Sequence, residues 1–398
     1  MSPAAAQEIR SEASRSNADP AAAQDVRAAI DALSTDLYKV MARGPGNVVV
    51  SPYSVGIALA MARVGAVGET ANQIDAVLHA ALGGELSAGF NALDQALAER
   101  PGKHQMFGQT LELELAIASR LWGQKDLVFE RPFLDQLARD YGAGVQVVDY
   151  KTAADGARRT INDWVAARTR DRIKDLIPPG VIDAQTRLIL TNATYLKAAW
   201  RKRFNDAVDG TFHRADGSKV RAKMMRLSET LGYGAGDDYQ TVRLPYAGGL
   251  SMILVVPSAG NLDALERGLD GPTLRRAVNG LSNTPVKLSM PKFSFRFKAR
   301  LKDVLGELGM PIAFTSRADF SGITNEEPLQ IADVIHEAFV SVDEKGTEAA
   351  AAAAQVYRLS IVALREVELT IDRPFLFLIQ DDETGAILFM GRVSDPAT

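Results

Sequence analysis

The chain has 398 residues, 46% of them hydrophobic, with a formal net charge of −4 and no cysteine. This length exceeds the roughly 250 to 300 residues at which a single hydrophobic core usually stops growing, so one large domain and two domains are both open. The small charge favours no nucleic acid partner, and the lack of cysteine excludes disulfides, thiol nucleophiles and iron–sulfur clusters.

The N-terminal part divides into a tail and the start of a folded region. Residues 1–24 are polar and alanine-rich, which predicts a disordered tail. Apolar residues then recur at helical spacing from Val26 to Val40, and no later shift in composition marks a boundary, so a single domain over residues 25–398 is expected. The tail lacks the apolar block of a signal peptide. The chain as written is therefore expected in the cytoplasm, although a secreted protein whose signal was removed has the same sequence.

Hydrophobic periodicity places helices and strands along the rest of the chain. Ser51-Pro52 is typical of an N-cap and the first residue of a helix, which Gly65 ends. Further helices are expected at 69–82, 87–99, 131–141 and 155–172. Strands are expected at 48–50, 111–122, 188–196, 219–231, 240–244, 251–256, 286–297, 335–342 and 367–371. Because strands dominate the second half, the pattern predicts an α+β fold.

The common signatures of enzymes and cofactor sites are absent from the sequence. There is no Gly-x-Ser-x-Gly elbow, no phosphate loop and no His-Glu-x-x-His motif. No apolar run is long enough to cross a membrane. The histidines are too scattered for a metal site; they are His79, His104, His213 and His336. We therefore expect no enzyme activity, no cofactor, no metal and no membrane partner.

His336 differs from the other histidines because it lies among apolar residues of an expected strand. A buried imidazole needs hydrogen-bond partners, and polar residues on other apolar segments, Ser51, Ser54 and Asn192, are the candidates. A serine hydrolase using Ser51 or Ser54 with His336 is the alternative. No glycine elbow or oxyanion loop accompanies these residues, so the sequence disfavours nucleophilic attack.

The run 343–354 is Asp-Glu-Lys-Gly-Thr-Glu followed by six alanines. Alanine and glutamate favour a helix by propensity. The flanking segments, 335–342 and 367–371, instead alternate apolar residues as strands do. Side chains this small also suit a segment that is exposed in one state and lies between packed strands in another. We therefore interpret the run as a mobile strand.

These features occur together in one known family, and the chain resembles a serpin, a serine protease inhibitor, over about residues 25–396. Besides the run 343–354, the matching stretches are Val50-Ser-Pro-Tyr-Ser54, Thr191-Asn-Ala-Thr-Tyr-Leu-Lys197 with Trp200, Leu288-Ser-Met-Pro-Lys-Phe293, Arg373-Pro-Phe-Leu-Phe377 and Leu388-Phe-Met-Gly-Arg392. They stand in the family's order, and the small hinge residues resemble those of an inhibitory member, in this case a prokaryotic one.

The resemblance implies a fold and a mechanism. The fold has three β-sheets, about nine α-helices and an exposed reactive loop over about residues 345–366. The mechanism is that of a metastable monomer and suicide substrate: a serine protease cleaves the loop, which inserts into the central sheet and traps the protease as a covalent acyl-enzyme. Heating is expected to give loop–sheet polymers. A non-inhibitory serpin-fold protein that binds a ligand or acts as a chaperone is the alternative.

The resemblance also implies roles for individual residues. The implied hinge consists of Glu344, Gly346, Thr347, Glu348, Ala349, Ala350, Ala351, Ala352 and Ala353, of which 349, 351 and 353 face inward on insertion. The implied shutter, which holds the central strands together, consists of Ser51, Ser54, Asn192 and His336. The implied breach, where insertion begins, consists of Trp200, Lys292 and Glu344.

The family's spacing from Glu344 places the reactive bond between Ser360 and Ile361. Ser360 would suit an elastase-like or subtilisin-like protease with a small specificity pocket. The alternatives at this position are Arg358, for a trypsin-like protease, and Tyr357 or Leu359, for a chymotrypsin-like one.

Overall fold

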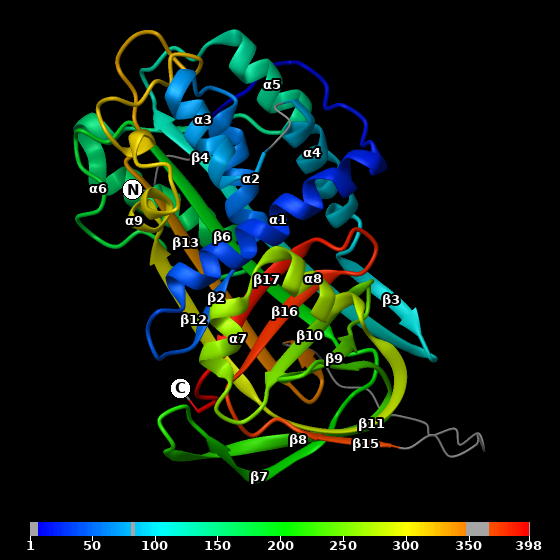
Figure 1. Ribbon diagram of the computed structural model, residues 1–398. Coiled ribbons are helices and arrows are strands. Elements are labelled where there is room, and N and C mark those ends of the chain that lie inside the picture. The colour runs from blue at the N-terminus through cyan, green and yellow to red at the C-terminus, as the bar shows by residue number, and fades with distance from the viewer. Residues whose placement is uncertain (1–6, 81–83, 348–365, 398) are drawn as a thin grey trace.

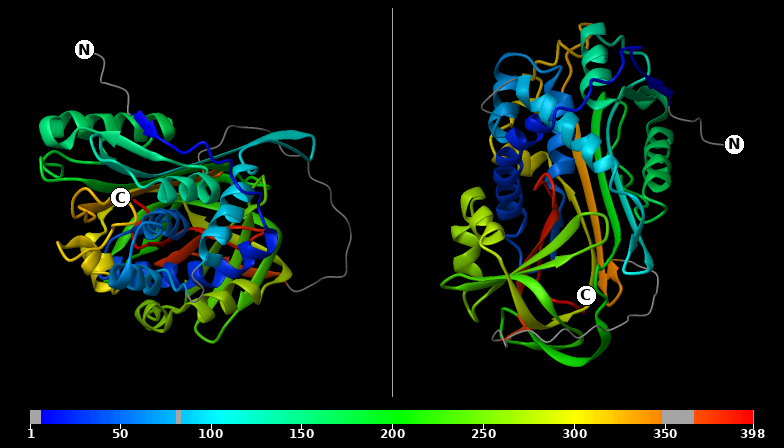
Figure 2. Two further views of the ribbon diagram at one scale, coloured as in Figure 1. Left: turned by 90° about the horizontal axis from the view of Figure 1, so that it is seen from above. Right: turned by 90° about the vertical axis from the view of Figure 1, so that its right-hand side faces the viewer.

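The computed structural model describes residues 7–80, 84–347 and 366–397. Its larger helices cover both faces of an eight-stranded sheet, sheet A (Figures 1 and 2). The order in this sheet is β1-β5-β4-β6-β14-β13-β12, and β3 pairs with β4. The strands are β1 (Gln7–Ile9), β3 (Gly102–Met106), β4 (Gln109–Gln124), β5 (Val145–Val148), β6 (Leu188–Ala199), β12 (Phe293–Arg300), β13 (Asp333–Asp343) and β14 (Gly346–Thr347).

The remaining nine strands form one hydrogen-bonded sheet instead of two separate sheets. The long strand β8 joins the two parts, since it pairs with β7 and β11 along most of its length and with β9 at its end. The strands of this nine-stranded sheet are β2 (Val48–Val50), β7 (Asn205–His213), β8 (Lys219–Ala235), β9 (Tyr239–Pro245), β10 (Leu250–Pro257), β11 (Ser282–Pro291), β15 (Val367–Thr370), β16 (Phe375–Asp381) and β17 (Ile387–Val393).

The described residues contain nine α-helices, as expected. They are α1 (Pro20–Met41), α2 (Pro52–Arg63), α3 (Gly68–Val77), α4 (Gly84–Ala98), α5 (Arg131–Tyr141), α6 (Tyr150–Arg168), α7 (Leu262–Gly268), α8 (Gly271–Asn279) and α9 (Lys302–Glu307). Helices α2 and α6 lie on opposite faces of sheet A (Figure 2). Successive side chains of β4 point to opposite faces of the sheet, and both faces are apolar. Leu121 packs in the hydrophobic core between the sheet and α2, and Trp122 packs in the core between the sheet and α6. The α+β class is confirmed.

The prediction of a disordered tail is wrong for the part of it that is described. Residues 7–9 form β1, which pairs with the edge strand β5, and α1 begins at Pro20 with Asp19 as its N-cap. The strand could not be predicted from its own residues because its hydrogen-bond partners come from a strand more than 130 residues away. Sheet edges present unpaired N–H and C=O groups that a short extended segment can satisfy.

Several helix boundaries also differ from the prediction. Helix α6 starts with a single turn at Tyr150, which the Asp149 side chain caps by accepting a 3.0 Å hydrogen bond from the Thr152 N–H. Ala153 has non-helical angles (φ −143°, ψ 45°), so the continuous part of α6 begins close to the expected residue 155, and it ends at Arg168 instead of residue 172. Helix α3 ends at Val77, earlier than expected. Ser51 is the N-cap residue of α2, but its side chain makes no capping bond.

Candidate functional site

The centre of sheet A is formed by β6 and β13, which pair directly over only part of their length. They are parallel neighbours from the pair Ile189 and Asp333 to the pair Tyr195 and Phe339. Beyond this point β14 lies between them. Gly346 pairs with Ala199 on one side, and both residues of β14 pair antiparallel with the end of β13 on the other. The chain therefore turns back after β13 and begins a new strand inside the sheet.

Gly346 occupies a place in β14 that other residues cannot take without strain. Its φ is +145°, a conformation that L side chains rarely adopt. A Cβ at this position would lie 2.1 Å from the Ala198 carbonyl oxygen and 2.8 Å from the Trp200 backbone nitrogen. Glycine thus allows the backbone of β14 to approach β6 closely enough to pair with it.

A buried polar cluster lies below β14, on the face of the sheet that contacts α2. His336 of β13 lies opposite Asn192 of β6, and its Nδ1 is 2.6 Å from the Asn192 Oδ1. The Ser51 backbone N–H donates to His336 Nε2 at 3.3 Å. Ser54 Oγ lies 2.9 Å from the hydroxyl of Ser119, to which Asn192 Nδ2 donates at 3.5 Å. The cluster thus connects β4, β6, β13 and the start of α2.

These contacts fix the protonation state of His336. Because Nε2 accepts a hydrogen bond from Ser51, Nδ1 must carry the proton that is donated to Asn192, and the ring is neutral. Complete burial, which disfavours the imidazolium, lowers the pKa of His336 to about 3. The prediction that His336 is buried and hydrogen-bonded is confirmed.

The cluster does not have the arrangement of a hydrolase site. Ser51 offers His336 its backbone N–H, and its hydroxyl has no hydrogen-bond partner among the described residues. The Ser54 hydroxyl bonds Ser119. The side chains of Ser51, Ser54, Asn192 and His336 are fully buried, with 0% of each residue exposed. The described geometry thus supplies neither a nucleophile bonded to a base nor a path for a substrate.

Ser119 was missed in the sequence, although a signal for it exists. It lies on the α2-facing side of β4, where the neighbouring inward positions are apolar, and it pairs with Asn192 across the sheet. A serine within an apolar stripe must find a partner when it is buried. Only the register of β4 against β6 identifies that partner as Asn192.

A second group of contacts holds the turn between β13 and β14. The Trp200 indole Nε1 donates to the Asp343 carbonyl oxygen at 2.9 Å, and the Trp200 ring stacks on Tyr246 with centroids 4.1 Å apart. Lys292 Nζ lies 2.8 Å from Glu344 Oε2. The residues expected at the breach therefore lie together around this turn.

The environment of Glu344 favours its ionised form. Burial alone would raise the pKa of this carboxyl, but hydrogen bonds from Lys292 and from the backbone N–H of Ala207, 3.1 Å from Oε1, outweigh it. The pKa of Glu344 therefore lies below its ordinary value. The charged carboxylate connects Lys292, which lies between β11 and β12, to Ala207 of β7.

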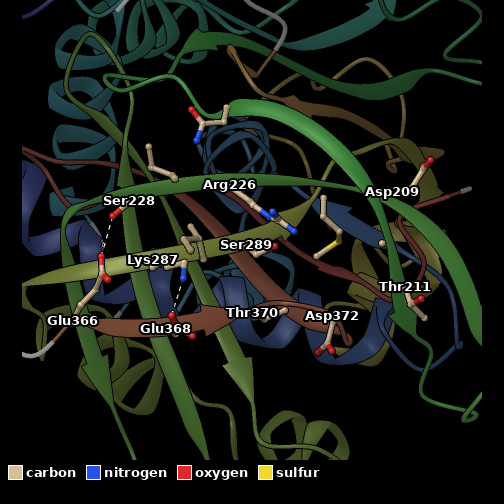
Figure 3. Close-up of a pocket in the computed structure, with 15 residues that line it drawn as sticks. Asp209, Thr211, Arg226, Ser228, Lys287, Ser289, Glu366, Glu368, Thr370 and Asp372 are labelled. Atoms are coloured by element: carbon tan, nitrogen blue, oxygen red, sulfur yellow. Dashed lines mark hydrogen bonds and ion pairs between the residues drawn. The ribbon is translucent and has the colours of Figure 1, made fainter. Parts of the chain in front are cut away.

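The chain is described again from Glu366, which directly precedes β15 in the other sheet. Ser228 donates to Glu366 at 2.9 Å, and Lys287 lies 2.7 Å from Glu368 of β15 (Figure 3). These side chains line a surface cavity of about 760 Å³ (Figure 3). The hinge residues 348–353 and the candidate reactive-bond residues Tyr357, Arg358, Leu359, Ser360 and Ile361 lie outside the described residues.

The described residues contain no candidate metal centre and no candidate membrane-spanning helix. In that part of the chain, no group of three or more histidine, aspartate or glutamate residues is placed to hold a metal ion. None of its helices is both long enough and apolar enough to cross a membrane.

Comparison with known proteins places the chain in a family. A family model described as "Serpin (serine protease inhibitor)" matches residues 28–396. The chain is 37% identical to an uncharacterised serpin-like protein of Thermococcus kodakarensis, over 92% of this chain and 85% of that protein. It is 34% identical to leukocyte elastase inhibitor A of Rattus norvegicus, over 88% of this chain and 93% of that protein.

Solved structures give the same result. The thermophilic serpin tengpin in its native state matches with a TM-score of 0.85 and 25% identity, over 98% of this chain and 100% of that one. A tumour-suppressing serpin matches with a TM-score of 0.83 and 26% identity, over 93% of this chain and 99% of that one. Sequence, family model and fold agree, and the chain belongs to the serpin family.

Proposed function

We propose that the chain is an inhibitory serpin that traps a serine protease as a covalent acyl-enzyme. The observation that carries the proposal is the position of Gly346 and Thr347, which already form the first residues of a strand between β6 and β13. Six alanines follow two positions later in the sequence. Small residues next to a strand that has begun inside the sheet are what continued insertion requires.

The covalent step would take place in the loop beyond β14. The protease serine attacks the carbonyl carbon of the reactive bond, the C–N bond breaks, the new N-terminus leaves, and an ester joins serpin and protease. We assign the bond to Ser360 and Ile361 on the family spacing, with Tyr357, Arg358 and Leu359 as alternatives. Insertion of about fifteen residues at roughly 3.3 Å each then moves the protease on the order of 50 Å, toward the far end of sheet A.

The central polar cluster would control when this happens. The described β6–β13 pairing must break for the strand to extend beyond Thr347, and the bond between His336 and Asn192 joins those two strands. We therefore assign Ser51, Ser54, Asn192 and His336 the role of the shutter, with Ser119 added. Insertion adds about one ladder hydrogen bond per residue, each worth roughly 1 kcal/mol, so the uninserted fold is held by a kinetic barrier.

The target is proposed to be an elastase-like or subtilisin-like protease, with trypsin-like and chymotrypsin-like enzymes as alternatives. A relative that is 34% identical is named leukocyte elastase inhibitor A, which supports the first choice. The protein would act as a monomer, and loop–sheet polymers on heating follow from the same mobile strand. The second candidate function, ligand binding or chaperone activity on a serpin fold, has no specific contact in its favour.

The deciding experiment mixes the protein with trypsin, chymotrypsin, elastase and subtilisin and resolves the products on denaturing gels. An SDS-stable complex with at least one protease is expected. The mass of the released C-terminal fragment identifies the reactive bond. Cleavage by every protease with no retained complex would falsify the inhibitory proposal and leave the binding function.

A further inference from the structure

The turn between β3 and β4 has an unusual residue at its tip. The strands pair up to Met106 and Gln109, so Phe107 and Gly108 form a two-residue hairpin loop. Their φ angles are +51° and +74°, the signs that define a type I′ turn. Asparagine followed by glycine is the sequence best suited to this turn. A phenylalanine at positive φ is a strained choice that nothing in the turn itself requires.

The Phe107 ring makes contacts that a strained turn residue does not need. Phe107 as a residue is 63% exposed, which equals the highest value among the exposed large hydrophobic residues in the described part of the chain. The Arg201 guanidinium carbon lies 5.5 Å and the Lys202 Nζ 5.2 Å from the ring centroid, both within the range of cation–π contacts. We call Phe107, Arg201 and Lys202 the tip patch.

The tip patch borders a surface cavity of about 230 Å³. Trp200, Phe204 and Pro245 contribute apolar side chains to its lining. Lys202 lies 3.7 Å from Glu229 and is partly neutralised by it. Arg201 has no carboxylate partner among the described residues, so its charge is available to another molecule. Aromatic and arginine side chains that lie together beside a small cavity are typical of the residues that dominate protein interfaces.

The position of the tip patch relates it to the reactive loop. Arg201 and Lys202 directly follow Trp200, whose backbone N–H donates to the Lys345 carbonyl oxygen at 2.9 Å. Gly346, the next residue, pairs with Ala199. The patch therefore adjoins the point where the described chain leaves sheet A toward the reactive loop. The hairpin that carries Phe107 projects from the body of the molecule (Figure 1).

We propose that the tip patch is a docking surface for the target protease, used before the loop is cleaved. The partner surface it fits is apolar and acidic: a hydrophobic contact covers the Phe107 ring, and a carboxylate beside the protease's active-site cleft pairs with Arg201. This inference rests on the proposed function, since a protease bound to the loop comes close to the chain on either side of it. The contact with the protease would explain why a strained residue, Phe107, is kept at an exposed turn.

The test separates docking from trapping by using proteases whose active-site serine is replaced by alanine, which bind the loop without cleaving it. Dissociation constants are measured for trypsin, chymotrypsin, elastase and subtilisin in this form. For the protease that the unaltered chain binds most tightly, Phe107→Asn and Arg201→Glu are each expected to weaken binding about tenfold. The Arg201→Glu effect should shrink as salt is raised.

Phe107→Asn is a favourable variant because it places asparagine before Gly108, so the hairpin is expected to keep or gain thermal stability. Val128→Asn is the matched control, since Val128 is also 63% exposed but follows the opposite end of β4. The control should bind as the unaltered chain does. The stoichiometry of covalent trapping should be the same in all these variants, because the patch acts before insertion.

Four results would overturn the inference. They are equal binding by the unaltered chain and Phe107→Asn, no binding of any inactive protease, a changed trapping stoichiometry with unchanged binding, and self-association of the unaltered chain that Phe107→Asn abolishes. The last would assign the patch to a second copy. Failure of the proposed function looks different: Phe107-dependent binding of inactive protease without covalent trapping of the active form leaves the docking surface standing.

Discussion

His336 Nδ1 and Asn192 Oδ1 lie 2.6 Å apart on the two strands that β14 separates at one end of sheet A. Both side chains are fully buried, and each belongs to one of the strands that must part if the loop inserts. A bond between neutral partners at this place holds the strands without the cost of a buried charge. It also makes the pairing sensitive to protonation of the imidazole.

Acid is expected to weaken the uninserted fold through His336. Burial lowers its pKa to about 3, whereas an unfolded histidine has its ordinary value of 6.5. The unfolded state therefore binds the proton first, and the contribution of His336 is fully present above pH 6.5 and declines as the pH falls toward 3. Between these two pKa values the free energy of unfolding falls by about 1.4 kcal/mol for each pH unit.

The measurement is the urea midpoint of the native transition at several pH values, for the unaltered chain and His336→Gln. The variant should be less stable at pH 7 and should lack this part of the acid dependence, so the two curves approach each other as the pH falls. Parallel curves would show that His336 does not carry the effect and that carboxyls whose pKa is lowered in the folded state, such as Glu344, do.

Gly346→Ala is expected to expel β14 from the sheet. The new Cβ would lie 2.1 Å from the Ala198 carbonyl oxygen, and the φ of +145° adds strain. The state in which β14 pairs with β6 is therefore expected to be destabilised by about 2 kcal/mol or more. Hydrogen exchange at the Trp200 amide, which donates to Lys345, should accelerate. Gly44→Ala is the control, because nothing lies within 4 Å of its Cβ position. Unchanged exchange in Gly346→Ala would contradict the described pairing.

Lys292→Met is expected to act on the turn between β13 and β14 more than on global stability. The Lys292 side chain is 37% exposed, so solvent screening limits its ion pair with Glu344 to less than about 1 kcal/mol. The lowered pKa of Glu344 means that this stabilisation is present above pH 4.5 and is lost as the pH falls through the lowered value.

The turn is followed through the fluorescence of Trp200, which should change in Lys292→Met and become less sensitive to acid. Lys287→Met is the matched control, since Lys287 forms a 2.7 Å ion pair with Glu368 away from β14. If both variants alter the fluorescence equally, the effect is one of general charge and not of the turn.

Arg15→Met is expected to destabilise the chain by about 1 to 2 kcal/mol, contrary to what a disordered tail would give. Arg15 Nε donates to Asn91 Oδ1 at 2.9 Å, and its Nη2 lies 2.7 Å from Asp94 Oδ2. The urea midpoint measures the change. Arg317→Met, at an exposed arginine, should leave the midpoint in place. Equal midpoints for both variants would mean that the N-terminal segment contributes nothing to stability.

Ala351→Glu is expected to convert the proposed inhibitor into a substrate. A carboxylate forced into the sheet interior costs several kcal/mol, which slows insertion relative to hydrolysis of the acyl-enzyme. The stoichiometry of inhibition measures this ratio. Ala350→Glu, whose side chain would point to the opposite face of the inserted strand, should have the smaller effect. A larger effect of Ala350→Glu than of Ala351→Glu on the stoichiometry of inhibition would contradict the prediction that residue 351 faces inward.

Much of the local structure follows from signals within short stretches of the sequence. Helix α5 has the predicted bounds 131–141, because its apolar spacing and its proline at the first turn are local signals. The alternation before Asp343 correctly predicted β13, and the isolated polar residues among apolar ones correctly indicated that His336 is buried with partners.

Which distant residues contact each other depends instead on how the strands pair in the folded chain. The register of β6 against β13 and β4 selected Asn192 and Ser119 as cluster members, and a sheet edge turned residues 7–9 into a strand. The close approach of Gly346 depends on β6, and the contacts of the Phe107 ring depend on the loop after Trp200. The physical reason is that periodicity and capping act within a few residues, whereas sheet hydrogen bonds join segments whose separation in sequence carries no signal of their pairing.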